Sequence, residues 1–107
     1  MTLSFNQVLY DTTKDVLKTL ANFQQTKGTE YQIRRIGIFG SAARNQLVDT
    51  SDVDIVVELL EPDLLALVGI KQDLEALLQR SVDIVRYREQ MNAFLKQRIE
   101  EEAVYVY

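Results

Sequence analysis

Hydrophobic and polar positions alternate along the chain in a way that separates helical from extended segments. Through the N-terminal quarter, apolar residues recur every three or four positions, which predicts a helix from about Phe5 to Lys27. Gly28 follows directly and is expected to end this helix in the left-handed conformation that glycine adopts readily.

Three short apolar runs then predict strands at Ile36–Phe39, Asp52–Leu60 and Ser81–Val85. Between the first two, Ser41–Asn45 is typical of a short helical turn that begins straight after the strand. The C-terminal segment Val104–Tyr107 also alternates. We interpret it either as a small edge strand packed near the last helix or as a contact with a partner.

Two further helices complete the predicted order. Pro62 suits the first turn of a helix whose apolar stripe is expected to face the core. That stripe consists of Leu64, Leu67, Val68, Leu74, Leu77 and Leu78. A last helix is predicted from Glu89 to about Glu102, with Glu100–Glu102 as a solvated face. The order predicts an α/β (α+β) fold, in which a small mixed sheet of about three strands packs with four helices.

The composition indicates one globular domain, which we expect to span residues 1–107. Hydrophobic residues make up 47% of the chain and charged residues 26%, as is ordinary for such a domain. No apolar run approaches the roughly 20 residues that a membrane span needs. The N-terminal residues lack the basic-then-apolar order of a signal peptide. We therefore expect a cytoplasmic protein with no membrane partner.

Two missing residue types narrow the chemistry. The chain has no His and no Cys, which excludes a Ser–His triad, a thiol nucleophile, a structural zinc site and a disulfide framework within it. Its net charge of −4 argues against direct, sequence-independent binding to nucleic acid. The remaining chemistry uses carboxylates, hydroxyls, Lys or Arg, and metals that prefer oxygen.

The acidic residues near the predicted strands form the candidate metal site. Asp52 and Asp54 are two positions apart on an extended segment, so their carboxylates share one face. Asp83 lies on the third strand and can face them if the strands are neighbours; alternatively, it caps the following turn. Clustered carboxylates repel one another unless a cation intervenes, and Mg²⁺ prefers oxygen ligands. Two such ions about 3.5–4 Å apart suit a phosphoryl displacement.

The turn after the first strand is the candidate phosphate site. Gly40 lets a triphosphate approach the backbone without a Cβ in the way. Ser41 adds a hydroxyl donor, and free N–H groups follow it. Arg44 either contacts phosphate or forms a surface ion pair with Asp49 or Asp52.

In these motifs the chain resembles the minimal nucleotidyltransferases of the polymerase-beta superfamily. Gly40-Ser41, ten residues, and then Asp52-Val53-Asp54 match the family signature, and Asp83 matches its later acidic residue. The resemblance covers about Ile36 to Arg86. It implies transfer of a nucleoside monophosphate from a nucleoside triphosphate to a hydroxyl. It also implies that Asp52 and Asp54 bind both metals, and that Asp83 binds the catalytic metal and helps to deprotonate the acceptor.

The resemblance also implies a partner. Minimal nucleotidyltransferases of this size are often the antitoxins of HEPN/MNT toxin–antitoxin modules, of type VII-like systems, and adenylylate a tyrosine of the HEPN toxin with ATP. This reading implies a hetero-oligomer with the toxin. Two alternatives stay open: a non-catalytic antitoxin that neutralises the toxin by binding, and a nucleotidyltransferase for a small molecule.

Overall fold

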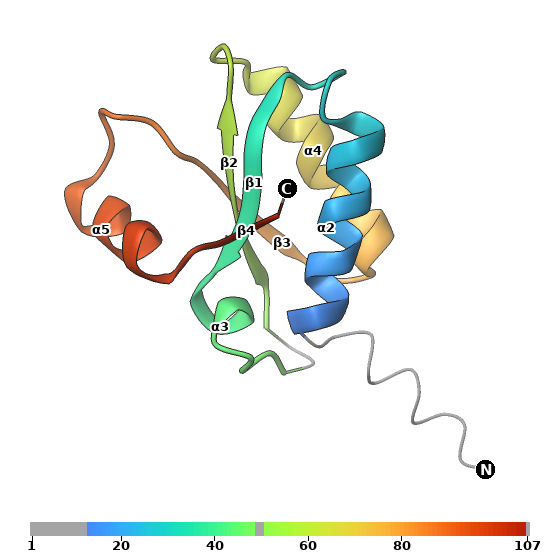
Figure 1. The fold of residues 1–107 in the computed structure, drawn as a ribbon, viewed down its shortest axis with the longest axis vertical. Helices are drawn as coiled ribbons and strands as arrows, with labels where there is room; N and C mark the ends of the chain where they lie inside the picture. The colour runs from blue at the N-terminus through green and yellow to red at the C-terminus, as the bar shows by residue number, and fades with distance from the viewer. Residues whose placement is uncertain (1–12, 49–50, 107) are drawn as a thin grey trace.

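The computed structural model describes residues 13–48 and 51–106, so the expected helix start near Phe5 lies outside the described residues. The elements follow in the order α2 (Thr13–Lys27), β1 (Ile33–Phe39), α3 (Gly40–Ala43), β2 (Val53–Leu59), α4 (Leu64–Leu78), β3 (Val82–Arg86), α5 (Ala93–Glu102) and β4 (Val104–Val106) (Figure 1). This alternation confirms the predicted mixed class of helices packed with a small sheet. Within the described ranges, the helices are too short or too polar to form a membrane span.

The sheet has the strand order β3-β2-β1-β4. β1 is antiparallel to both β2 and β4, whereas β2 is parallel to β3. The sheet therefore has four strands instead of about three. The added strand is the C-terminal segment, in which Val104 pairs with Ile38 and Tyr105 with Gly37. The edge-strand interpretation of this segment is thus confirmed.

The two faces of the sheet carry different layers. α2 and α4 lie on one side of the sheet and α5 on the other (Figure 1). The larger core cluster fills the first side and includes Leu20, Phe23, Ile36, Ile38, Ile55, Ile70 and Leu74. A smaller cluster of Phe39, Val56 and Ile99 fills the second. Because side chains alternate along a strand, Asp54 lies on the face that Val56 and α5 share.

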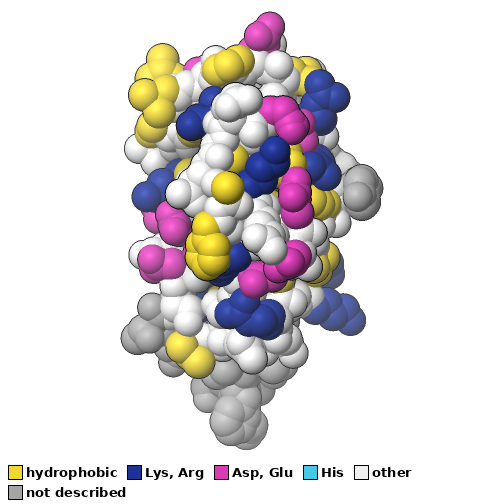
Figure 2. Space-filling view, turned by 90° about the vertical axis from the view of Figure 1, so that its left-hand side faces the viewer, with side chains coloured by type: hydrophobic (Ala, Val, Ile, Leu, Met, Phe, Trp, Pro, Cys, Tyr) yellow, Lys and Arg dark blue, Asp and Glu magenta, His cyan; other side chains and the backbone are white. Residues whose placement is uncertain are grey.

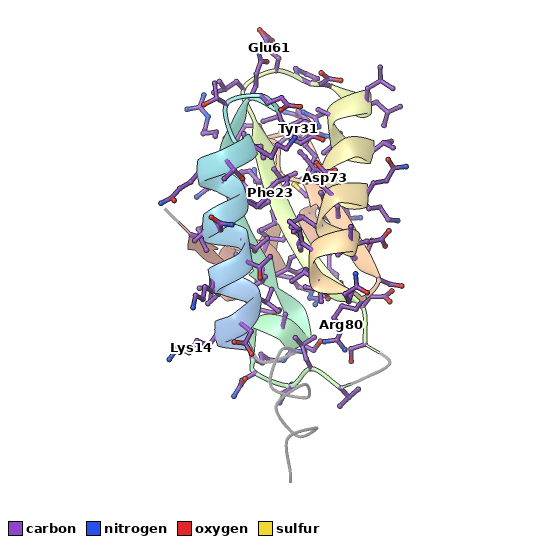
Figure 3. The ribbon with its side chains drawn as sticks, turned by 90° about the vertical axis from the view of Figure 1, so that its right-hand side faces the viewer. Lys14, Phe23, Tyr31, Glu61, Asp73 and Arg80 are labelled. Atoms are coloured by element: carbon purple, nitrogen blue, oxygen red, sulfur yellow. The ribbon has the colours of Figure 1, made fainter. Side chains whose placement is uncertain are left out.

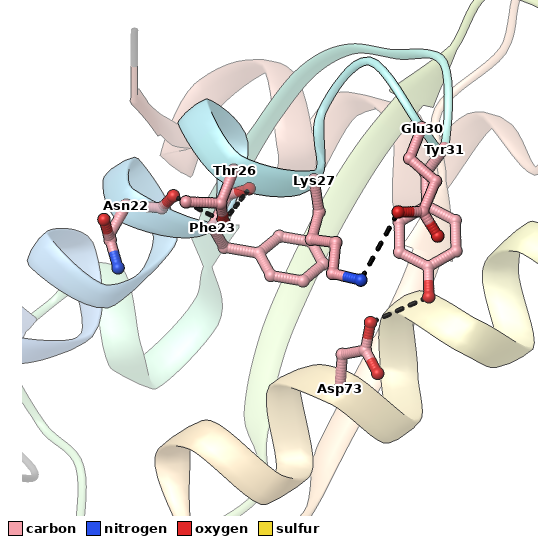
Figure 4. Close-up of polar contacts among 7 residues, drawn as sticks. All are labelled: Asn22, Phe23, Thr26, Lys27, Glu30, Tyr31 and Asp73. Carbon is pink, nitrogen blue, oxygen red and sulfur yellow. Dashed lines mark hydrogen bonds and ion pairs between the residues drawn. The ribbon is translucent and has the colours of Figure 1, made fainter.

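At one end of the contact between α2 and α4, a tyrosine bridges the two helices. Tyr31 stacks on Phe23, with ring centroids 6.1 Å apart, and its hydroxyl donates a 2.7 Å hydrogen bond to Asp73 (Figures 3 and 4). This hydrogen bond, with burial and the Asp73 charge, raises the pKa of Tyr31 to about 12. A Cβ on Gly69 would lie 2.8 Å from the Tyr31 hydroxyl oxygen, so the missing side chain gives Tyr31 its room.

The phase of α4 differs from the prediction. Its fully buried positions are Ala66, Ile70 and Leu74, whereas 75% of Leu64 is exposed to solvent. Val68 and Leu77 of the predicted stripe are also exposed. The rest of the stripe faces the core: Leu74 is buried, and Leu67 and Leu78 are partly buried and pack against the core. Leucines occupy several sides of the first turns of α4, so the apolar pattern alone does not determine which side of the helix is buried.

Two substitutions in α4 test this corrected phase. Leu74→Ala is expected to lower the free energy of unfolding by about 2–5 kcal/mol, because it leaves a cavity in the core. Leu64→Ala removes the same atoms from an exposed position and is expected to change it by less than about 0.5 kcal/mol. Urea unfolding of both variants measures the difference, and a comparable loss in Leu64→Ala would contradict the observed phase.

Three predicted helix boundaries also need correction. Gly28 does not take the left-handed conformation, and the chain instead turns towards β1 at Gln32, whose φ is 56°. Pro62 precedes the N-cap of α4, where Asp63 accepts a 3.1 Å hydrogen bond from the Ala66 N–H. The last helix begins at Ala93 instead of Glu89, because Asn92 caps it. In each case a polar capping side chain or a turn determines where the helix begins or ends, and the spacing of the apolar residues does not indicate that position.

Candidate active site

The sheet brings the predicted acids of two strands together. Asp54 in β2 and Asp83 in β3 are direct partners in the parallel register. Paired residues on neighbouring strands point to the same face, so both carboxylates lie on the α5 side of the sheet. Asp52 comes two residues before Asp54, just ahead of β2, and is exposed. The structure thus places all three predicted acids at one end of two adjacent strands.

The charges around Asp54 show that several side chains converge there. Burial raises the pKa of the Asp54 carboxyl, and the negative charge of Asp83 raises it further. Asp52 adds to this increase, whereas the positive charges of Arg98 and Arg44 oppose it. The Asp54 carboxyl in β2 is therefore within electrostatic range of charged side chains from β3, from α5 and from the segments that precede β2 and follow α3.

These acids can supply part of a magnesium site. In the part of the chain that the structure describes, no three acids stand close enough to form a ready-made metal cluster. Mg²⁺, however, is usually held by one or two carboxylates, with water and substrate phosphates completing its shell. Asp54 and Asp83 meet that need, since burial and the neighbouring charge of Asp83 disfavour the charge of Asp54 until a cation arrives.

The turn after β1 lies directly beside Asp54. Gly40 opens α3, which covers Gly40–Ala43 instead of the predicted Ser41–Asn45, and it has a φ of 65°. A Cβ at this position would collide with Asp54 Oδ2. Glycine is therefore required here for two reasons: the left-handed backbone and the proximity of the acid. Ser41 follows it and is half-buried, and the Thr13 hydroxyl holds α3 against α2 by donating to the Ala42 carbonyl.

An acidic residue of α5 closes the site from the other side. The Gly40 N–H donates a 3.1 Å hydrogen bond to Glu102 Oε1. Arg44 Nη1 lies 3.1 Å from the same oxygen, and Arg98 Nη2 lies 3.7 Å from it. Figure 2 shows this side of the molecule, with acidic and basic side chains intermingled over it.

This arrangement corrects two interpretations of the sequence. The ion-pair partner of Arg44 is Glu102 instead of Asp52, while Asp49 lies outside the described residues. Glu102 is also more than part of a solvated face, since its side chain is 26% exposed and its Oε1 atom contacts Gly40, Arg44 and Arg98. The one signal in the sequence is the spacing of Arg98 and Glu102, which places them on one helix face. Their approach to Gly40 depends on the tertiary fold.

The raised pKa of Asp54 predicts how stability depends on pH. The folded protein binds this proton more tightly than the unfolded chain, so the group lowers stability as pH rises from the unfolded pKa of about 3.9 through the folded value. Asp54→Asn is therefore expected to leave the ligand-free melting temperature at pH 7 unchanged or raise it by up to about 4 °C. This advantage should vanish below about pH 4.

Thermal melts of the wild type and Asp54→Asn at both pH values measure this effect. Added Mg²⁺ and ATP should raise the melting temperature of the wild type and not that of the variant, because a ligand stabilises the state that binds it. A large loss of stability in the ligand-free variant would show that Asp54 supports the fold instead.

A mixed sheet with paired acids on adjacent strands, beside a glycine-serine turn, defines the chain as a nucleotidyltransferase-type domain. The family model described as "Polymerase beta, Nucleotidyltransferase" matches residues 18–107. The chain belongs to this polymerase beta nucleotidyltransferase family.

Known proteins of this family resemble the whole described domain. The chain is 33% identical over 96 residues to the Methanocaldococcus jannaschii protein MJ0126, covering 89% of this chain and 98% of the relative. It is 32% identical over 96 residues to protein adenylyltransferase MntA of Thermococcus cleftensis, covering 89% of this chain and 96% of the relative.

Solved structures show the same fold. A structure described as a minimal nucleotidyltransferase superposes with a TM-score of 0.68 at 32% identity, covering 82% of this chain and 93% of the other. A chain from a tri-AMPylated Shewanella oneidensis HEPN toxin in complex with its MNT antitoxin superposes with a TM-score of 0.64 at 19% identity, covering 89% and 71%. At that identity, the second likeness concerns the fold alone.

Proposed function

We propose that this protein is a Mg²⁺-dependent adenylyltransferase that transfers AMP from ATP to a hydroxyl group of a protein partner. The observation that carries the proposal is the pairing of Asp54 with Asp83 on adjacent strands, on the sheet face that the Gly40 turn borders. The names of the relatives support the choice of AMP and of a protein acceptor, since MntA of Thermococcus cleftensis is a protein adenylyltransferase.

Each side chain of the site has a proposed role in binding. Asp52, Asp54 and Asp83 hold magnesium, which when bound neutralises the phosphates and polarises the reacting phosphoryl group. The Gly40 N–H, the Ser41 hydroxyl and Arg44 bind phosphate oxygens and orient the triphosphate. The donors and the acids are adjacent, because Gly40 lies in direct contact range of Asp54.

The proposed reaction is an in-line displacement at the α-phosphorus. The acceptor oxygen forms a bond to the α-phosphorus while the bond from that phosphorus to the bridging oxygen of the β-phosphate breaks. Pyrophosphate leaves with the electron pair. Asp83 is exposed and takes the proton of the acceptor hydroxyl, then passes it to water.

We propose a HEPN toxin as the partner and a tyrosine as the acceptor, so that the protein acts as the antitoxin of a pair. The support is the likeness to MNT chains from toxin–antitoxin complexes, one of which contains a tri-AMPylated HEPN toxin. In such a pair the acceptor brings its own docking surface, and the two chains form a hetero-oligomer.

A labelling experiment tests the proposed function. The protein is incubated with Mg²⁺, ATP labelled on the α-phosphate, and the product of the neighbouring gene as the proposed HEPN partner. Label is expected on a tyrosine of the partner, and EDTA should prevent it. Neutralisation of the toxin without label would support neutralisation by binding. Label on a small hydroxylated molecule and not on the partner would support the small-molecule alternative.

A further inference from the structure

The C-terminal end of α5 carries three consecutive acids, Glu100, Glu101 and Glu102, where the helix dipole disfavours negative charge. Glu100 is compensated by Tyr87, which follows β3 and whose hydroxyl donates a 2.7 Å hydrogen bond to it. Glu102 is compensated by the Gly40 N–H and Arg44, at the two ends of α3. The helix dipole disfavours the negative charge of Glu102, yet donors distant in the sequence stabilise it, which indicates that this charge has a function.

The donors that hold Glu102 are of the kind that bind phosphate. The Gly40 N–H and Arg44 donate hydrogen bonds to one oxygen, Glu102 Oε1, and Arg98 forms an ion pair with the same oxygen at 3.7 Å. A backbone N–H with two guanidinium groups is a strong site for any oxyanion, because charge-assisted hydrogen bonds do not distinguish carboxylate from phosphate oxygen.

Arg98 links this anion site to the acids of the sheet. Its guanidinium lies 5.9 Å from the centroid of the Phe39 ring, directly before Gly40 in the chain. Gly40 in turn donates its N–H to the same Glu102 oxygen and lies against Asp54, whose Oδ2 a Cβ on Gly40 would meet. A phosphate bound at this position would therefore contact the arginines on one side and a cation on Asp54 on the other.

We propose that Arg98 is a further phosphate-binding residue, and that the Glu102 carboxylate occupies the polyphosphate position until the nucleotide displaces it. The inference rests on the proposed function and deepens it. The same three donors serve Glu102 in the free protein and the polyphosphate in the complex. Glu102 thereby neutralises part of the arginines' charge before the nucleotide arrives, and it weakens nucleotide binding by competition.

Substitution of Glu102 tests the competition. Glu102→Gln keeps the shape of the side chain and removes its charge, so the affinity for tripolyphosphate and for Mg²⁺–ATP is expected to rise at least about threefold at low salt. Glu101→Gln is the matched control, since Glu101 is exposed at the same helix end and bonds Gln97 instead of the site. It makes the same change in net charge and should alter the affinity by less than about 1.5-fold. Arg98→Gln should lower it at least about threefold.

Titration calorimetry with tripolyphosphate separates this inference from the proposed function, because no transfer is involved. Equal affinities of Glu102→Gln and Glu101→Gln would overturn the inference, even if the wild type labels its partner. So would the absence of tripolyphosphate binding in both the wild type and Glu102→Gln. Tighter binding by Glu102→Gln alone would support it, even if no label is transferred.

An NMR titration of the wild type gives a second test that does not depend on any variant folding. As tripolyphosphate is added, the Gly40 amide signal and the side-chain carboxyl signal of Glu102 are expected to shift along the same saturation curve. The carboxyl signal of Glu101 should stay in place. A shift of the Gly40 amide with an unchanged Glu102 carboxyl would contradict displacement.

Discussion

Asp54→Asn is expected to lower the rate of AMP transfer by more than about a hundredfold, since even groups that merely orient metal ligands are worth 10–100-fold. Asp54 lies between Asp83 and Asp52, and the fold already disfavours its charge in the absence of a cation. The amide keeps the volume of the side chain but cannot balance a divalent ion. Transfer of labelled AMP to the partner, at saturating ATP and Mg²⁺, measures the loss.

Glu58→Gln is the control for this substitution. Glu58 lies on the same strand and the same face as Asp54, but it pairs with Arg35 at 2.8 Å, away from the Gly40 turn. Its loss should leave the transfer rate within about twofold, because this half-buried ion pair contacts no residue of the proposed site. If Asp54→Asn transferred AMP as fast as Glu58→Gln, Asp54 would not be a ligand of a catalytic cation.

Gly40→Ala is expected to have the second large effect, on both binding and stability. The backbone at this position has a φ of 65°, which costs an L-residue about 1–2 kcal/mol. The new Cβ would also collide with Asp54 Oδ2, so the turn and the acid must move apart. We expect a loss of about 1–3 kcal/mol in the free energy of unfolding and at least a tenfold loss in affinity for ATP.

Gly69→Ala separates these two effects. Gly69 lies in α4 on the other face of the sheet, and its Cβ would meet the end of the Tyr31 side chain instead of the site. This variant is expected to change stability by about 1 kcal/mol or less, because better helix propensity offsets the crowding. It should bind ATP as the wild type does. Unchanged ATP affinity in Gly40→Ala would contradict the placement of phosphate at this turn.

The site residues that could be predicted from the sequence are those whose positions depend on local rules. Asp52 and Asp54 share a face because side chains alternate along a strand, and Gly40 follows an apolar strand at a turn. Placing Asp83 beside them required one further assumption, that β2 and β3 are neighbours. The structure shows that neighbourhood and the register of the two strands.

Other features could not be predicted because they depend on tertiary contacts. Glu102 meets Gly40 only because α5 crosses the face of the sheet that carries Asp54, and no local pattern encodes that approach. The buried side of α4 was predicted in the wrong phase, since Leu64, Val68 and Leu77 of the predicted stripe are exposed. The strand Val104–Val106 is too short for its alternation to distinguish an edge strand from a contact with a partner.

The most direct test of the account is a crystal structure of the protein with Mn²⁺ and an ATP analogue that cannot be cleaved. Anomalous scattering locates the metal. The account predicts a peak between the carboxylates of Asp54 and Asp83, with a phosphate oxygen in its coordination shell and another phosphate oxygen on the Gly40 N–H. A nucleotide bound away from the Gly40 turn, or a metal that neither carboxylate coordinates, would contradict it.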